Sequence, residues 1–362
     1  MPVEPIRVAV WSPCWSQVGG TETFHRDFFR AMVEDDGLEP RIEPIGIGTI
    51  KAPHDSIFDL IPDRCQVEWG LNALYKVAKD ADVIVQWGFN KLACKLPRSE
   101  AYPWFVTTIH GSTNSGWTME IAYACGPHTD HYACVSEAAA GCVPQGKPYT
   151  VIPNAAPDIR LDEPVVRPNH EDDERFVFIH PGRLVQDKGL DAIVQLARSG
   201  ELLNLPKKCE IVCVGIGPYD RKIAFASKET NAKYGRPLIR LEPPRKDWWT
   251  IPHDAMILPS RHEGFGYVTV ESWIVGTPVI STNDGIAKSY PNAFHPIYSM
   301  PCQHVTPKEL YDAMSSFLDL DHQRRNIMAL DGFTIATNDL SFESFKSSWR
   351  KLVRDLGKKR KR

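Results

Sequence analysis

The sequence lacks the features that would place the protein in a membrane or on a polyanion. No apolar run approaches the roughly 18 residues that a membrane-spanning helix needs, and residues 1–10 lack the basic start and long apolar segment of a secretory leader. A charge of one sign is also missing, since 45 acidic and 42 basic residues leave a formal net charge of −3. No global basic field recruits nucleic acid, and we expect a cytoplasmic protein.

Disulfide, zinc and dinucleotide patterns are absent as well. The nine cysteines include no C-x-x-C pair, and several lie inside apolar segments. An odd number of cysteines without the spacing of a zinc site favours reduced thiols over a disulfide framework or a structural metal. The pattern G-x-G-x-x-G is missing after the first predicted strand, residues 6–11, which argues against a dinucleotide-dependent oxidoreductase.

What the sequence does contain indicates two globular domains. At 362 residues, with 43% hydrophobic and 24% charged residues, the chain is long for one compact core. Between Ala155 and Arg175, prolines alternate with acidic residues, and such a segment is typical of an interdomain linker. We predict an N-terminal domain, a linker, a C-terminal domain and a final helix with a basic tail, over residues 1–156, 157–174, 175–338 and 339–362.

Residues 255–280 are the most informative segment. An apolar run of strand length leads into the turn Glu263-Gly264-Phe265-Gly266, a helical pattern and a second apolar run, which predicts a strand, loop, helix and strand. The backbone N–H groups of Gly264, Phe265 and Gly266 would lie free at the start of the helix, where unpaired donors and the helix dipole favour an anion. We therefore predict a phosphate site at this turn.

Two carboxylates belong to this segment, Glu263 in the turn and Glu271 in the helix. A buried carboxylate needs hydrogen-bond donors, and the hydroxyl groups of a sugar or a ribose can supply them. The alternative is that Glu271 is solvated and that Glu263 is merely favoured by the helix dipole. Taken singly, each glutamate fits the second interpretation better.

Three other residues lie where a parallel sheet places its functional groups. Arg183 and Lys188 flank a glycine-containing loop after the predicted strand 176–179 and can converge on a diphosphate, although both also fit a charged surface. His110 follows the predicted strand 104–109, at the edge where ligands bind in open parallel sheets. A lone histidine is more often structural.

Two glycine-rich loops complete the candidates. Gly19 and Gly20 precede a predicted helix at 23–32, where glycine allows the backbone to approach a ligand closely. An ordinary strand-to-helix turn with Thr21 as N-cap explains them equally well. Gly215 and Gly217 follow a predicted strand and are a weak signal alone.

Together these motifs closely resemble those of retaining GT-B glycosyltransferases, in particular the large family 4. Glu263 and Glu271 match its E-x7-E signature, residues 182–190 match its G-R-l-x-x-x-K-G-l pattern, and His110-Gly111 matches its His-Gly after a strand. The resemblance covers nearly the whole chain and is strongest over residues 176–286. Residues 238–249 depart from the family pattern near the base, which leaves the nucleotide open.

The resemblance implies the fold and the reaction. The fold would be α/β of the GT-B type, with two Rossmann-like domains that face each other across a cleft and a last helix that crosses back to the N-terminal domain. The enzyme would move a sugar from a nucleotide-diphosphate sugar to an acceptor hydroxyl, with retention of configuration and without a metal or another cofactor.

The resemblance also implies residue roles. Arg183 and Lys188 would bind the diphosphate, Glu271 the ribose, and Glu263 with the amides of residues 264–266 the sugar, which His110 also contacts. The glycines expected along the donor site are Gly19, Gly20, Gly182, Gly215, Gly217, Gly264 and Gly266, together with Phe265.

The acceptor stays open. A glycan or small molecule is favoured over a hydroxymethylated base in DNA, which would have to be flipped into the cleft. Stacking surfaces for a ring are offered by Trp11, Trp15, Trp87 and Trp117.

Two further functions fit the same fold, a sugar-nucleotide epimerase and a non-catalytic nucleotide-sugar binder. The basic tail, residues 358–362, is either a solvated end or a contact for a polyanion.

Overall fold

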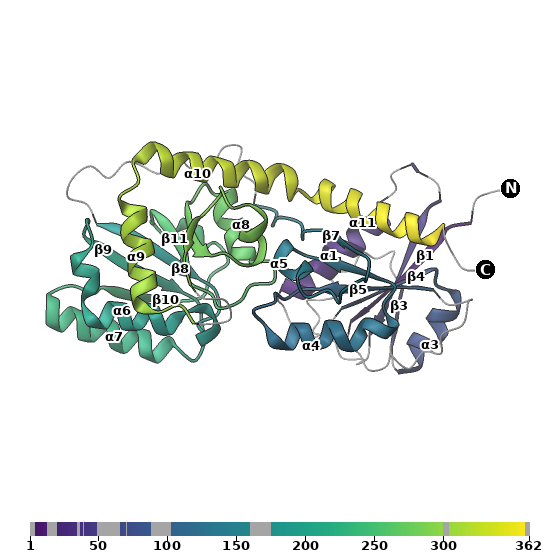
Figure 1. Ribbon diagram of the computed structural model, residues 1–362, viewed down its shortest axis with the longest axis horizontal. Helices are drawn as coiled ribbons and strands as arrows, with labels where there is room; N and C mark the ends of the chain where they lie inside the picture. The colour runs from purple at the N-terminus through teal and green to yellow at the C-terminus, as the bar shows by residue number, and fades with distance from the viewer. Residues whose placement is uncertain are drawn as a thin grey trace. The chain divides into compact units, whose positions relative to one another are not determined.

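The computed structural model of the chain describes residues 4–12, 20–34, 37–38, 40–48, 66–69, 71–87, 103–159, 175–299 and 304–358. They belong to two compact units (Figure 1). Unit 1 comprises Met1–Ala155 and Leu340–Arg362, and unit 2 comprises Ala156–Asp339. Most of the predicted linker, from residue 160 to residue 174, lies outside the described residues, as do residues 359–362 of the basic tail.

Unit 1 is built on a seven-stranded sheet with the order β3-β2-β1-β4-β5-β6-β7. All of its strand pairs are parallel, so each connection must cross a face of the sheet. The strands are β1 (Ile6–Ser12), β2 (Ile42–Gly48), β3 (Gln66–Trp69), β4 (Val83–Trp87), β5 (Trp104–Ile109), β6 (His131–Cys134) and β7 (Tyr149–Val151). The helices are α1 (Gly20–Val33), α3 (Leu71–Asp80), α4 (Gly116–Cys125), α5 (Glu137–Ala140) and α11 (Phe342–Gly357).

Side chains alternate between the two faces of β1 and bury both of them. Val8 and Val10 pack against α1 and α11, whereas Ala9 and Trp11 pack against α3. Burial on both faces explains why β1 reads as a continuous apolar run in the sequence. It also corrects one prediction, because the buried Trp11 offers no ring surface to an acceptor.

Two buried arginines of helix α11 donate hydrogen bonds to backbone carbonyls in the N-terminal segment of unit 1. Arg350 donates to the carbonyl of Ala31 at 3.0 Å, near the C-terminal end of α1. Arg354 donates to the carbonyl of Leu38 at 3.1 Å. Cationic groups at a helix C-terminus satisfy carbonyl groups that the helix itself leaves open. The C-terminal helix is therefore part of the core of unit 1.

Unit 2 has a six-stranded parallel sheet with the order β10-β9-β8-β11-β12-β13. Its strands are β8 (Phe176–Pro181), β9 (Cys209–Val214), β10 (Ile239–Glu242), β11 (Ala255–Leu258), β12 (Val279–Thr282) and β13 (His295–Ile297). Its helices are α6 (Leu190–Ser199), α7 (Asp220–Tyr234), α8 (Tyr267–Ile274), α9 (Pro307–Leu318) and α10 (His322–Thr334). A π-helical turn, Ile335–Asp339, follows α10. The order of these strands is that of a Rossmann fold, as in the first six strands of unit 1.

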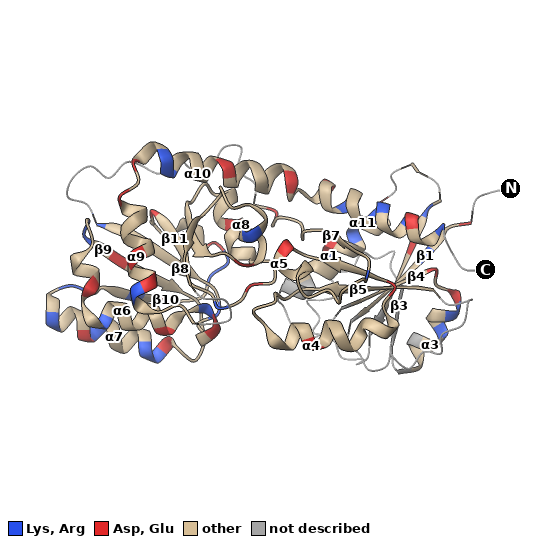
Figure 2. Cartoon of the chain, in the orientation of Figure 1, with Lys and Arg blue, Asp and Glu red and all other residues tan. Residues whose placement is uncertain are grey.

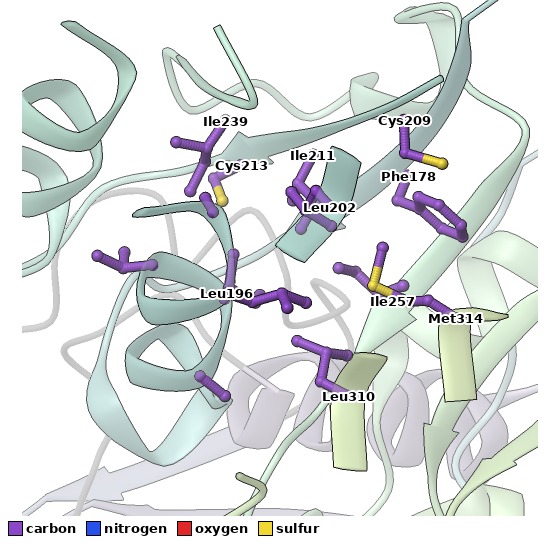
Figure 3. Close-up of a cluster of buried hydrophobic side chains, with 14 of the residues drawn as sticks. Phe178, Leu196, Leu202, Cys209, Ile211, Cys213, Ile239, Ile257, Leu310 and Met314 are labelled. Carbon is purple, nitrogen blue, oxygen red and sulfur yellow. The ribbon is translucent and has the colours of Figure 1, made fainter. Parts of the chain in front are cut away.

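The core of unit 2 lies between its sheet and helices α6, α7 and α9 (Figures 1 and 3). Phe178, Ile211 and Ile257 from three neighbouring strands meet Leu196 of α6 and Leu310 of α9 (Figure 3). All six residues of β9 are buried, including its two cysteines, which are free thiols. The sequence predicts this α/β fold with two Rossmann-like domains correctly, and the strand, loop, helix and strand of residues 255–280 are β11, α8 and β12.

Helix α7 of unit 2 carries charges of both signs. Basic and acidic residues are mixed along α7, whose sequence is DRKIAFASKETNAKY (Figure 2). Within the described part of the chain, no helix combines the length and the apolar character that crossing a membrane requires.

Candidate functional site

The candidate residues of unit 2 lie on loops at one edge of its sheet. Strands β9, β8, β11 and β12 are consecutive parallel neighbours, so their carboxyl ends meet at the same edge. Residues 182–189 follow β8, residues 215–219 follow β9, residues 259–266 follow β11 and residues 283–286 follow β12. These four loops and helix α8 form the candidate site.

The loops after β8 and β9 continue the pairing of their strands. The N–H of Leu184 donates to the carbonyl of Ile216 at 3.0 Å. A Cβ atom on Gly215, whose φ is +152°, would lie 1.9 Å from the carbonyl oxygen of Gly182, and one on Gly217 would lie 2.5 Å from that of Leu184. The close contact between the two loops therefore requires Gly215 and Gly217. Donor binding by Gly182, Gly215 and Gly217 stays a prediction.

Lys188 joins the loop after β8 to the loop after β11. It is the last residue of a 3-10 helix, Gln186–Lys188, and its Nζ forms a hydrogen-bonded ion pair with Oε1 of Glu263. The N–H of Arg261 donates to the carbonyl of Asp187 at 2.8 Å and fixes the two loops together beside this pair. Lys188 keeps further N–H groups for an oxyanion, because an ammonium group has three.

Arg183 lies on the same loop in a different environment. Its side chain is exposed, and among the described residues it has no hydrogen-bonding or ion-pair partner. An exposed guanidinium with its full set of donors can bind a phosphate through two parallel hydrogen bonds. The expected convergence of Arg183 and Lys188 on one diphosphate stays a prediction.

Glu263 is buried and ionised. Burial alone would raise the pKa of its carboxyl, but the Lys188 ammonium, the nearby Ser260 hydroxyl and the nearby His262 together lower the pKa below its ordinary value. The backbone N–H of Glu263 donates to Oδ2 of the buried Asp284 at 2.9 Å, so the loop after β12 holds the residue in place. The site thus contains a fixed negative charge next to a cation.

The turn Gly264–Gly266 begins α8 and is held by the loop after β12. Gly266 is the N-cap of α8 in the left-handed conformation, with φ +87°. Ile286 donates its N–H to the carbonyl of Phe265 at 2.8 Å, and a Cβ atom on Gly285 would lie 2.8 Å from that same oxygen. Among the described residues, the N–H groups of Phe265 and Gly266 donate to no backbone carbonyl, which fits the predicted anion site.

Glu271 has a different kind of partner from Glu263. It lies on α8, and its Oε2 accepts a hydrogen bond of 2.7 Å from the indole Nε1 of Trp248. Burial raises the pKa of Glu271 above its ordinary value, and the hydrogen bond from Trp248 only partly offsets this effect. Among the residues that the structure describes, the carboxyl of Glu271 therefore has a neutral partner and no cation.

His110 lies at the carboxyl end of β5 in unit 1, the position expected for a ligand contact. Its Nε2 lies 3.1 Å from Oγ1 of Thr108, and its ring packs edge-on against Phe24 at 4.7 Å. Burial, together with the nearby His25, lowers the pKa of His110 to about 3. The imidazole is consequently neutral at physiological pH, so it can form hydrogen bonds without adding charge.

The remaining candidates of unit 1 are only partly described. Gly20 is the first residue of α1, whereas Gly19 lies outside the described residues. Because α1 already includes Thr21, that residue is not the N-cap that the alternative interpretation required. Trp15 and the side chain of Trp87 also lie outside the described residues.

Three buried residues at or beside the site were not among the site residues predicted from the sequence. Asp284 and Trp248 hold the two glutamates. His180 of β8 donates from Nδ1 to the carbonyl of Ile257 at 3.0 Å, and burial lowers its pKa to about 4. The sequence carried no signal for these contacts, since each joins residues on different strands or loops. Among the described residues, no group of three or more histidine, cysteine or acidic side chains could hold a metal ion.

The part of the chain that carries these loops is similar to a known protein family. Residues 163–329 match the family model described as Glycosyl transferases group 1. A segment of the chain is 32% identical over 119 residues to D-inositol 3-phosphate glycosyltransferase of Thermobispora bispora. That match covers 30% of this chain and 27% of the relative, so it spans about a quarter of the relative's length.

Solved structures are similar over nearly the whole chain. The apo form of lipopolysaccharide outer core galactosyltransferase WaaB has a TM-score of 0.70 and 12% identity, covering 97% of this chain and 99% of its own. Alr3699/HepE of Anabaena, in complex with UDP and glucose, has a TM-score of 0.66 and 16% identity, covering 97% and 100%. These likenesses agree with the two parallel sheets described above and confirm the predicted GT-B fold.

Proposed function

We propose that this chain, in which residues 163–329 form a glycosyl transferases group 1 domain on a GT-B fold, transfers a sugar from a nucleotide-diphosphate sugar to an acceptor hydroxyl. The observation that carries the proposal is the Lys188–Glu263 ion pair beside the N-terminus of α8. It combines a cation, a fixed carboxylate and backbone N–H groups at one sheet edge. These are the groups that a diphosphate joined to a sugar requires.

The diphosphate would bind to Arg183, Lys188 and the amides of the turn Gly264–Gly266. Arg183 is exposed and has no partner among the described residues, so binding a phosphate would break no contact of its guanidinium group. Lys188 can keep one hydrogen bond to Glu263 and donate its other N–H groups to phosphate oxygens. The anion would also interact favourably with the dipole of α8.

The two carboxylates would bind the hydroxyl groups of the donor. An ionised carboxylate only accepts hydrogen bonds, so Glu263, whose pKa is lowered, is suited to the hydroxyls of the transferred sugar. Glu271 would accept from the ribose. His110, which is neutral, would contact the sugar as a hydrogen-bond partner.

We also propose that transfer proceeds with retention and without a metal. The departing phosphate would take the proton of the acceptor hydroxyl on the same face of the sugar, so no separate protein base is needed. The negative charge that develops on the diphosphate would be stabilised by Arg183 and Lys188. Preorganised charges of this kind are usually the largest contribution to catalysis.

For the acceptor we propose a glycan or a small polyol, ahead of a hydroxymethylated base in DNA. The name of the Thermobispora relative specifies an inositol phosphate, and the solved structure of Alr3699/HepE contains UDP and glucose. UDP-sugars and inositol phosphate are therefore the first compounds to test. We propose a cytoplasmic location, which the five free, buried cysteines among the described residues support.

The experiment that tests the proposal measures the release of nucleoside diphosphate from UDP-, GDP- and ADP-sugars. Each donor is supplied alone, with glycosides, with inositol phosphate and with hydroxymethylcytosine DNA. Release from one donor that depends on one acceptor supports a transferase and names both substrates. Conversion of a donor to an isomer without acceptor would mean an epimerase, and binding without turnover would mean a regulatory binder.

A matched pair of variants ties the activity to the site. Lys188→Ala removes the cation beside Glu263, whereas Lys228→Ala removes an exposed lysine on α7. We expect only Lys188→Ala to lower product formation. Equal activities for the two variants would show that the reaction does not depend on this site.

A further inference from the structure

Trp248 lies in the segment where the sequence departs from the pattern of its family. It begins the 3-10 helix Trp248–Thr250 after β10, and its side chain is only 4% exposed. A buried indole N–H needs a hydrogen-bond acceptor. In this chain the acceptor is Oε2 of Glu271, which approaches from α8 at 2.7 Å.

The carboxyl of Glu271 is left incompletely satisfied by the protein. An ionised carboxylate offers about four lone-pair sites, and a buried one is stable only when several are used. Among the described residues, Trp248 is the hydrogen-bond donor that reaches Glu271. Burial still raises the pKa of Glu271 despite this bond, so one indole N–H does not compensate for the lost hydration. Donors from a ligand would complete its hydrogen bonding.

Local contacts surround Trp248 in its 3-10 helix. Before it, Arg245 forms two hydrogen bonds of 2.8 Å to the carboxylate of Asp247. After it, the hydroxyl of Thr250 donates to the carbonyl of Asp247 at 2.9 Å. The indole also packs against the ring of His253 at 5.6 Å. Trp248 thus donates to one oxygen of Glu271 from a buried, packed indole.

We propose that Trp248 is a positioning residue for nucleotide recognition, because its indole N–H fixes one oxygen of Glu271 and leaves the other lone pairs for the ribose hydroxyls. This inference rests on the proposed function, in which Glu271 binds the ribose. It adds that Trp248 sets the preference for a ribonucleotide over a nucleotide without ribose hydroxyls. Trp249, which is half-buried and packs edge-on against Trp248 at 6.0 Å, has no such role.

The test compares the binding of ribonucleotides with that of 2′,3′-dideoxynucleotides. Titration calorimetry gives the dissociation constants of UDP, GDP and ADP and of their dideoxy counterparts for the wild-type chain, for Trp248→Phe and for the control Trp249→Phe. For the nucleotide that the wild type binds, we expect Trp248→Phe to weaken the ribonucleotide about tenfold and to leave the dideoxy form nearly unchanged. Trp249→Phe should keep the wild-type ratio of the two constants.

A second variant keeps the shape of the ring. Replacing Trp248 by β-(3-benzothienyl)alanine exchanges the N–H for sulfur, so it removes the hydrogen bond while it retains the packing. The same loss of ribose preference in this variant would support the inference, as would the absence of any effect of the replacement on the ratio of the two constants when Glu271 is already replaced by alanine. Both readouts stay interpretable if Trp248→Phe does not fold.

Two outcomes overturn the inference in distinguishable ways. If the wild type binds a ribonucleotide more tightly than its dideoxy form and removal of the indole N–H leaves that ratio unchanged, Trp248 only fills space, and the proposed function survives. If the wild type binds none of the nucleotides, the proposed function fails and the inference fails with it.

Discussion

Glu263 and Glu271 lie on one loop and the helix that follows it, yet their hydrogen-bonding partners differ in charge and their pKa values shift in opposite directions. Glu263 pairs with the ammonium of Lys188, and its pKa lies below the ordinary value. Glu271 pairs with the neutral indole of Trp248, and its pKa lies above the ordinary value. The difference shows that an E-x7-E spacing places two carboxylates but does not determine the pKa of either. The partners, which come from other loops, determine it.

The largest effect on activity is expected from removing the ammonium group of Lys188, which pairs with Glu263. We expect Lys188→Ala to lower the turnover of the donor by about 100-fold, the scale of losing one preorganised electrostatic contact. Steady-state assays of nucleoside diphosphate release measure the change, with Lys228→Ala as the control. Near-normal turnover in Lys188→Ala would show that the ammonium group of Lys188 does not contribute to catalysis.

The second effect tests the support of Glu263. Asp284→Ala leaves the buried N–H of Glu263 without its acceptor, so we expect the free energy of unfolding to fall by about 1–3 kcal/mol. Asp284→Asn keeps an oxygen acceptor and should recover most of this loss. Urea denaturation of the two variants and the wild type measures the difference. Equal stabilities for Asp284→Ala and Asp284→Asn would contradict the contact's contribution.

The third effect is a pH dependence with opposite signs at the two glutamates. A lowered folded-state pKa means that ionised Glu263 stabilises the fold above the ordinary carboxyl pKa and that this stabilisation is lost as pH falls through the folded-state pKa. The folded-state pKa of Glu271 is raised, so ionised Glu271 destabilises the fold at neutral pH. This destabilisation disappears as the pH falls from the folded-state pKa to the ordinary carboxyl pKa.

Unfolding free energies of Glu263→Gln and Glu271→Gln, each measured against the wild type between neutral and acidic pH, test these signs. As pH falls, the advantage of the wild type over Glu263→Gln should shrink, whereas its stability relative to Glu271→Gln should increase. If the stability difference from the wild type changed with pH in the same direction for both variants, the two pKa values would not be shifted in opposite directions.

The smallest effect concerns a group that carries no charge. His110 has a pKa of about 3, so His110→Ala removes a neutral hydrogen-bond partner. We expect the kcat/KM for the donor to fall by less than about tenfold, in line with the loss of one neutral hydrogen bond. Unchanged kcat and KM in this variant would make His110 a structural residue.

Much of the fold was predictable because its signals are local. The apolar runs predicted as strands at residues 6–11, 104–109 and 176–179 are β1, β5 and β8, and the glycine turn at 264–266 leads into α8. The prediction that Trp11 offers a ring surface to the acceptor was wrong. An apolar run in the sequence does not reveal that its strand is buried on both faces, which makes the ring of Trp11 inaccessible.

The contacts of the candidate site were less predictable because they depend on strand order. Lys188 and Glu263 were both expected at the site, but their pairing follows from β8 and β11 being neighbours in the sheet. Gly215 and Gly217 were expected near a ligand, whereas the structure shows them against the loop after β8. The bond from Trp248 to Glu271 joins a 3-10 helix to α8, and no sequence spacing encodes it.

The membership of α11 in unit 1 has a consequence for the order in which the chain folds during synthesis. All of unit 2 lies between the two segments of unit 1, and Trp349 of α11 packs edge-on against Phe28 of α1 at 4.9 Å. The ribosome therefore synthesises all of unit 2 before it makes the helix that closes the core of unit 1. Phe24 and Phe28 stay without that cover until α11 has been synthesised, so the core of unit 1 is completed only after the whole of unit 2 has been made.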